Sequence, residues 1–237
     1  MREESAKPAR CGPGAKPAPS APGEKTAQSA PPEGLKMGYC DYFSASERDR
    51  VYHDSEWGIP LHDDNRLFEA LMLECLQCGL SWGIILKKRD VIRECFSGFD
   101  VKKVAAYTRA DEERIISTEG MIKNPGKIRA VIGNAGCFEE ISRDSGGFDK
   151  YLFSFTGGRT IVYEGHDEGK IPVSNALSKQ IAADLKKKGF KYLGPVTVYS
   201  FLQAVGVIND HDRSCPRGQM INRCFPVERR ACRGEEF

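Results

Sequence analysis

The sequence predicts a mainly α-helical fold, and three observations lead to this class. Apolar side chains recur at helical spacing through most of the chain between its two polar tails. Capping residues precede these stretches, and glycines or prolines follow them. Only residues 160–163 resemble a strand, inside an irregular stretch that Gly157, Gly158 and Gly165 interrupt. We therefore expect a helical bundle.

The first helices are marked by their start and stop residues. Asp63 or Asp64 can cap a helix over residues 65–78, and Gly79 ends it. Apolar side chains keep the same spacing after each following break. Further helices are expected at residues 82–96, 101–107 and 111–117, and from residue 127 onward.

The last two expected helices are joined by a short turn with glycine on both sides. Ser174 can cap a helix that runs to Lys188, Gly189 ends it, and Pro195 opens the next helix. A tight hairpin of this kind points free backbone N–H groups at an anion and can hold a DNA phosphate. Such hairpins also occur merely as turns, so the pattern alone leaves both interpretations open.

The two ends of the chain differ in composition from the region between them. Residues 1–36 are rich in Pro, Ala and Gly with almost no large apolar side chain, so they are predicted to be disordered. The folded domain is then expected over residues 37–216. Residues 217–237 are basic and interrupted by Gly218 and Pro226, which predicts a flexible extension with loose structure.

Composition and charge argue against several classes of protein. A net charge of +2 is too small to attract a polyanion by itself, so nucleic-acid binding would depend on local patches such as Lys186–Lys188. Nine cysteines without an apolar leader argue against export and predict a cytoplasmic protein. The most apolar window, residues 196–208, is shorter than the ~20 residues of a membrane span. We expect no membrane association.

Two pairs of metal-ligand residues stand near opposite ends of the expected domain. They are Cys40 with His53, and His211 with Cys215. Two thiolates and two imidazoles suit a tetrahedral zinc ion. Four protein ligands leave no position for an activated water, so a Zn²⁺ ion here would be structural. It would tie the ends of the domain together.

Glu74 is the carboxylate that most requires an explanation. On the expected helix it shares a face with Leu67, Leu71 and Cys78, so it should be buried. Burying an ionised carboxylate without a partner costs several kcal/mol. The partner is either a cation of the protein, such as Arg89, or a ligand that brings hydrogen-bond donors or positive charge. Spacing alone does not decide between them.

Three motifs together resemble one enzyme family. They are Tyr52–Gly58, Leu73–Trp82 and Asn209–His211, and they occur in this order beside the metal-ligand pairs. From Cys40 to Cys215 the chain is similar to the type I 3-methyladenine DNA glycosylases. The resemblance implies a helix-hairpin-helix glycosylase fold with the four metal ligands on zinc. It also implies a monomer that flips 3-methyladenine out of alkylated double-stranded DNA and hydrolyses its glycosidic bond, leaving an abasic site.

The resemblance further assigns roles to individual residues. Glu74 would be the catalytic carboxylate, reading the edge of the extruded base. The substrate-binding wall would comprise Tyr42, Tyr52, Trp57 and Trp82. The DNA-binding residues would be Gly79, Leu80, Lys191, Gly194 and Thr197. Leu80 would fill the gap left in the duplex, with a core leucine as the alternative. At Tyr42 the family often has Trp, and this difference could alter the width of the pocket.

Two other classes of function stay open at this stage. A zinc-stapled DNA-binding module without catalysis would share the metal ligands, although it has no reason to bury Glu74 among aromatic rings. A thiol redox protein would use Cys75 and Cys78, although no βαβ pattern surrounds them and both fall on apolar stripes. Strand cleavage is not expected, because a lyase needs an amine for a Schiff base and residues 195–199 contain no lysine.

Overall fold

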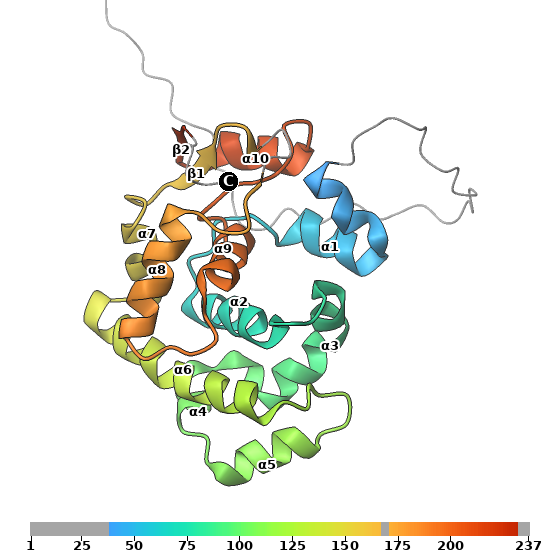
Figure 1. Cartoon of the computed structure of the whole chain (residues 1–237), viewed down its shortest axis with the longest axis vertical. Helices are drawn as coiled ribbons and strands as arrows, with labels where there is room; N and C mark the ends of the chain where they lie inside the picture. The colour runs from blue at the N-terminus through green and yellow to red at the C-terminus, as the bar shows by residue number, and fades with distance from the viewer. Residues whose placement is uncertain (1–37, 167–170, 232–237) are drawn as a thin grey trace, which may run out of the picture. The chain divides into compact units, whose positions relative to one another are not determined.

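The computed structural model describes residues 38–166 and 171–231 (Figure 1). The chain divides after Met37 into two units, and every element below lies in the second. The disorder predicted for residues 1–36 falls outside the described residues. In chain order the elements are η1 (Tyr39–Ala45), α1 (Glu47–Ser55), α2 (Asp64–Gln77), α3 (Trp82–Cys95), η2 (Ser97–Phe99), α4 (Val101–Ala105), α5 (Arg109–Ser117), α6 (Pro125–Ser145), α7 (Phe148–Ser154), β1 (Thr160–Tyr163), α8 (Ala176–Lys187), α9 (Pro195–Ala204), α10 (Pro216–Cys224) and β2 (Val227–Arg230). The prediction of a mainly α-helical fold is confirmed.

Helix α2 is the centre of the fold and packs against α3, α6, α7 and α9. The Asp63 carboxylate accepts a hydrogen bond from the Arg66 N–H at 2.9 Å and so caps the first turn. The helix stops where Gly79 adopts a positive φ of 77°, a conformation that favours glycine. Its most deeply buried side chains are Leu67, Phe68, Leu71, Met72, Cys75 and Leu76.

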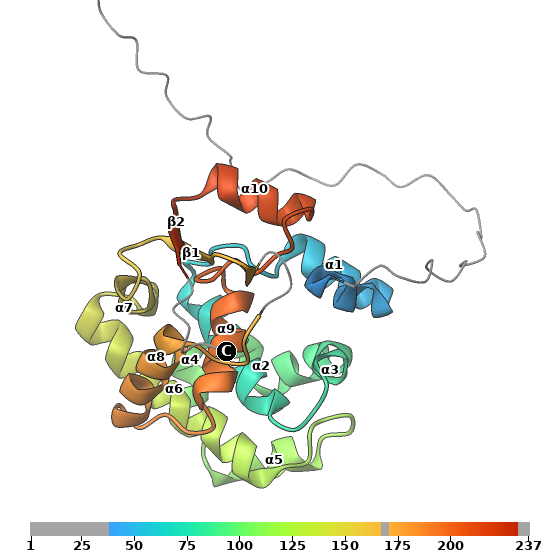
Figure 2. The ribbon, with the colours of Figure 1, turned by 45° about the horizontal axis from the view of Figure 1, so that its top comes forward.

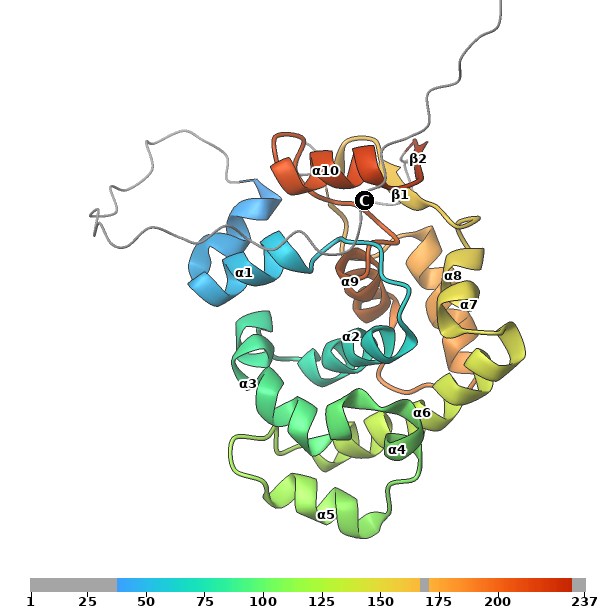
Figure 3. The ribbon, with the colours of Figure 1, turned by 180° about the vertical axis from the view of Figure 1, so that it is seen from behind.

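Helix α6 is the longest helix and underlies α2, with α4, α5 and α7 also packed against it (Figure 3). The Asn124 side chain accepts from the Lys127 N–H at 3.1 Å, and Pro125 occupies the first helical position. Gly146 ends the helix with a φ of 71°. Both ends therefore follow from local sequence.

Helices α8 and α9 form the predicted helical hairpin and pack against each other. Its first cap is Asn175 rather than Ser174, since the Asn175 side chain accepts from the Ser178 N–H at 2.9 Å. Gly189 leaves the helix with a φ of 95°, and Pro195 opens α9 as predicted. No side chain caps the N-terminus of α9, so its first N–H groups are not held in this way.

The prediction of loose structure after Cys215 was wrong for the described residues. Pro216 takes the first position of α10, where proline is favoured, and the side chain of Ile221 is fully buried. Strand β2 then pairs in parallel with β1, with Val227 opposite Thr160. Figure 2 shows α10 and both strands together at one end of the described unit. The pairing partner lies far back in the sequence, which is why local composition missed it.

The length and hydrophobicity of a helix decide whether it can cross a lipid bilayer. Among the helices that lie within residues 38–166 and 171–231, none combines the required length and hydrophobicity.

Candidate functional site

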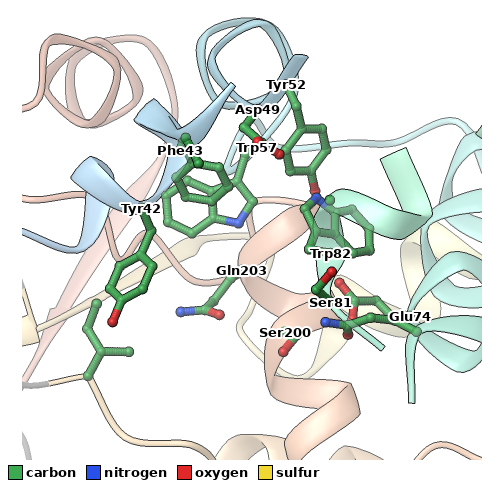
Figure 4. Close-up of a pocket in the computed structure, with 14 residues that line it drawn as sticks. Tyr42, Phe43, Asp49, Tyr52, Trp57, Glu74, Ser81, Trp82, Ser200 and Gln203 are labelled. Carbon is green, nitrogen blue, oxygen red and sulfur yellow. The ribbon is translucent and has the colours of Figure 1, made fainter. Parts of the chain in front are cut away.

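A cavity of about 760 Å³ lies among η1, α1, α2, α3 and α9 (Figure 4). The five residues predicted to form the substrate site all line it: Tyr42, Tyr52, Trp57, Glu74 and Trp82. The other lining residues were not predicted from the sequence, and they are Phe43, Ala45, Asp49, Gln77, Ser81, Gly83, Ile171, Ser200 and Gln203. The first four of these elements follow one another in the sequence, and α9, about 100 residues further along the chain, completes the pocket.

Glu74 lies in the wall of this cavity with only 3% of its surface exposed. Its Oε2 atom has no hydrogen-bond partner among the residues that the structure describes. Burial raises the pKa of Glu74 to about 8, because the charged form is poorly solvated there. Arg89, the alternative partner, binds Glu56 and Glu69 instead. The carboxyl group is therefore buried and available to a ligand.

Aromatic rings enclose the cavity on the side opposite Glu74 and beside it. The Tyr52 and Trp82 ring centroids are 5.3 Å apart, and those of Phe43 and Trp57 are 4.9 Å apart. The Trp82 Nε1 atom is buried without a partner in the described part of the chain. Tyr42 is 72% exposed, so it lies at the mouth of the cavity and not in its interior.

Gln203 is a lining residue that sequence reasoning missed, and a buried polar network fixes its amide. Its Nε2 atom donates to Asp210 Oδ2 at 2.7 Å, and the Tyr199 hydroxyl donates to the same oxygen at 2.5 Å. His166 Nδ1 lies 2.7 Å from the other oxygen, Asp210 Oδ1. A carboxylate accepts hydrogen bonds, so the amide nitrogen must face Asp210. The amide oxygen of Gln203 is then left for the cavity.

The predicted metal ligands also meet in space. The ligand atoms of Cys40, His53 and Cys215 all lie within 4.8 Å of one another, and together they could hold a metal ion. The hydrogen bond from the Cys40 thiol lowers the pKa of Cys215 and raises the pKa of Cys40, because the two adjacent sulfurs share one proton. This group joins η1 and α1 to the start of α10.

His211 is the fourth predicted ligand and lies just outside this group of three. Its ring centroid is 5.1 Å from that of His53, and its Nε2 atom is buried with no partner among the described residues. Burial lowers the pKa of His211 to about 4, so the imidazole is neutral and can donate a lone pair. Its Nδ1 atom is held 2.8 Å from Asn209 Oδ1. An orphaned imidazole nitrogen beside two cysteines and a histidine fits a metal ligand.

The metal-ligand group and the cavity share a wall. The Trp57 ring lines the cavity, and its centroid is 4.4 Å from that of His211 and 5.8 Å from that of His53. Tyr52 directly precedes His53 on α1. Any loosening of the metal-ligand group would therefore reach the cavity through these two aromatic residues.

The predicted DNA-side residues come from two loops that touch. Gly79 is exposed and Leu80 is half-buried against the core, between α2 and α3. Lys191 and Gly194 are exposed in the turn before α9. The Cys78 sulfur lies 3.5 Å from the Thr197 hydroxyl. The structure brings these residues together on one side, and their contact with DNA stays a prediction.

Comparison with known proteins places this fold and site in context. Residues 42–218 match the methyladenine glycosylase family. The DNA-3-methyladenine glycosylase 1 of Escherichia coli (strain K12) is 40% identical over 179 residues, which cover 76% of this chain and 96% of that protein. The DNA-3-methyladenine glycosylase of Haemophilus influenzae is 38% identical over 70% of this chain and 89% of its own. The solved 3-methyladenine DNA glycosylase I of Staphylococcus aureus superposes with a TM-score of 0.71 at 36% identity, covering 76% of this chain and 95% of that one.

Proposed function

Because the chain belongs to the methyladenine glycosylase family, we propose that it removes 3-methyladenine from alkylated double-stranded DNA by hydrolysis of the N-glycosidic bond. The observation that carries this proposal is the buried and unpartnered carboxyl group of Glu74 at the wall of the aromatic cavity. A protein that only binds DNA has no use for such a group. The product is an abasic site.

Glu74 favours a cationic base over a neutral one. With a pKa of about 8, its carboxyl group holds a proton in the ligand-free pocket at neutral pH. A positively charged ligand stabilises the ionised form, and the attraction is strong in a site of low dielectric. Normal adenine is neutral and gains nothing from this charge. The pocket thereby selects the alkylated base.

The aromatic rings add to the same preference. The faces of Trp57 and Trp82 attract a cation by ~0.5–2 kcal/mol each, depending on its desolvation. They also offer flat surfaces on which a purine can stack. The amide oxygen of Gln203 can accept a hydrogen bond from an amino group of the base, because Asp210 holds the amide nitrogen away from the cavity. The shape of the cavity, its charge and its hydrogen-bond acceptor then all favour the alkylated base.

Cleavage of the glycosidic bond requires little further catalysis by the protein. An adenine alkylated at N3 is positively charged, so it already leaves the sugar readily. Ionised Glu74 would also stabilise the positive charge that develops as the bond breaks. Water is the proposed nucleophile. The first residues of α9 contain no lysine, so we expect no Schiff base and no nicking of an abasic duplex.

On the DNA side, the turn before α9 is proposed to hold a backbone phosphate. Its glycine-bounded geometry leaves N–H groups at the start of α9 without a side-chain cap. Leu80, which follows Gly79 at the end of α2, would enter the gap that the flipped nucleotide leaves. A damaged base is less costly to unstack, which adds to the selection.

The metal is proposed to be a structural Zn²⁺ held by Cys40, His53, His211 and Cys215. Two sulfurs and two imidazole nitrogens are a common zinc ligand set, and they close the coordination shell. Metal analysis of the purified protein tests this assignment. Cys215→Ala should lose the zinc and lower the melting temperature, whereas Cys95→Ala, a control at another buried cysteine, should keep it. Full zinc content in Cys215→Ala would contradict the proposal.

The decisive experiment is the release of free base from DNA treated with a methylating agent, identified by chromatography. Wild-type protein should release 3-methyladenine and leave alkali-labile abasic sites, with no release from untreated DNA. Binding to the methylated duplex without any released base would instead indicate the non-catalytic zinc-stapled module.

A further inference from the structure

Two polar side chains on one face of α6 are buried beneath the two segments proposed to contact DNA, which are the loop of residues 78–81 and the turn of residues 189–194. Lys127 is 6% exposed and Asn134 is 1% exposed. They stand two helical turns apart, so both point in the same direction from the helix. Neither side chain lines the substrate cavity. Their burial therefore needs an explanation outside base recognition.

Lys127 holds the end of α2. Its ammonium group donates to the carbonyl oxygen of Leu76 at 2.7 Å and to that of Cys78. These carbonyls belong to the last turn of α2 and its cap, where helix carbonyls lack partners within the helix. The negative end of the helix dipole also favours a cation. No carboxylate of the described residues forms an ion pair with Lys127, so its partners are the last turn of α2 and Cys78, the residue at which the loop of residues 78–81 begins.

Asn134 holds the turn between α8 and α9. Its Oδ1 atom accepts from the Lys191 N–H at 2.9 Å, and its Nδ2 atom donates to the Lys191 carbonyl at 3.1 Å. One side chain thus fixes both backbone polar groups of a single residue in the turn. The two loops also touch directly, because the Cys78 sulfur lies 3.7 Å from the carbonyl oxygen of Tyr192.

We propose that Lys127 and Asn134 are positioning residues that set the loop of residues 78–81 and the turn of residues 189–194 in one fixed relation for DNA engagement. The proposal rests on the proposed function, in which the loop fills the gap in the duplex and the turn holds a phosphate. Both contacts must fall on the same short stretch of DNA. A rigid helix that anchors the two loops from below keeps that spacing without touching the nucleic acid itself.

The inference is tested by measuring two affinities separately. One is the Kd for a duplex with a tetrahydrofuran abasic analogue, and the other is the Kd for free 3-methyladenine. Asn134→Leu removes two hydrogen bonds at similar volume, and we expect it to weaken duplex binding about tenfold. Lys127→Met should do the same, while either variant changes the affinity for the free base less than about twofold. On methylated DNA, KM should rise with little change in kcat.

Ile141→Ala is the matched control, because Ile141 lies two further turns along the same face of α6 and its buried apolar side chain can form no hydrogen bond to either loop. It should lower the melting temperature and leave the ratio of the two affinities unchanged. Equal weakening of duplex and free-base binding in Asn134→Leu, or no weakening of either, would overturn the proposal. Should Lys127→Met fail to fold, Asn134→Leu carries the test alone. Wild-type protein that neither binds nor releases 3-methyladenine would instead remove the proposed function.

Discussion

Two buried glutamates on α2 have opposite surroundings. Glu69 is 6% exposed and accepts from Arg89 Nε at 2.7 Å and Arg93 Nε at 2.8 Å. Arg89 binds Glu56 as well, through two further hydrogen bonds of 2.8 and 2.7 Å. Glu74 is buried more deeply, yet its Oε2 has no partner in the described part of the chain. Five positions along one helix separate a carboxylate with two arginine partners from a carboxyl group that has an unpartnered oxygen.

These opposite surroundings indicate which carboxylate stabilises the fold and which one is available to a ligand. A buried acid that is fully paired stabilises or specifies structure, and its loss leaves its partners unpaired. A buried acid with no partner costs stability, so it persists only where something else requires it. At Glu74 the requirement is the aromatic cavity that it faces.

The largest expected effect is on base release by Glu74→Gln. This change keeps the volume and removes the negative charge that the cationic base would meet. We expect the rate of 3-methyladenine release to fall about 10²-fold or more, as when a charge-stabilising group is lost from a dry active site. The melting temperature at neutral pH should rise, because wild-type Glu74 is ionised in the unfolded chain and must take up a proton to be buried, and the variant removes this cost. Single-turnover assays beside thermal melts measure both, and an unchanged rate would contradict the assignment.

Glu69→Gln should show the reverse pattern. It leaves Arg89 and Arg93 without a shared carboxylate, and we expect a loss of about 2–3 kcal/mol in the free energy of unfolding, because Arg93 is partly exposed and solvent screens its share. Base release per folded molecule should change less than about threefold. Denaturant unfolding gives the first quantity. A loss of activity greater than the loss of folded protein would show that the ion-pair cluster takes part in catalysis.

Sequence patterns predicted the burial of Glu74, but they did not single out Glu69 or show which glutamate Arg89 binds. Helical periodicity placed Glu74 among buried positions, and the motifs brought Tyr52 and Trp82 into the site. The same periodicity left Arg89 as a candidate partner for Glu74, because the direction of a long side chain from another helix is not a local property. Only tertiary packing assigns Arg89 to Glu69.

Residues whose role depends on distant partners were missed for the same reason. In the sequence, Gln203 is one polar residue in an apolar window. Its role at the cavity becomes visible only in the fold, where Asp210 accepts a hydrogen bond from its amide. The parallel pairing of β1 with β2 was missed likewise, since its register joins Thr160 to Val227. The metal ligands were easier to find, because their residue types are rare and chemically specific.

The pH dependence of stability is expected to report the burial of Glu74. Burial raises the pKa of Glu74 from its ordinary value of 4.5 to about 8, so between these pH values the folded protein binds a proton that the unfolded chain has released. The stability that this proton contributes is fully present below pH 4.5, falls as pH rises, and is lost once pH has passed through about 8. Between pH 6 and pH 8, wild type should lose about 2 kcal/mol relative to Glu74→Gln. A difference that grows in favour of wild type as pH rises would contradict the buried acid.

The smallest expected effect is the energetic coupling between the two glutamates. In a double-mutant cycle of Glu69→Gln and Glu74→Gln, the changes in unfolding free energy should add within about 0.5 kcal/mol, since the two groups share no partner. A small second cavity, lined by Glu69, Arg89, Tyr52 and Trp82, lies behind the aromatic wall. If the ion-pair cluster set the position of that wall, the cycle would instead show coupling above about 1 kcal/mol. Independence in stability together with independence in base release would establish that α2 supports two separate functions on its two sides.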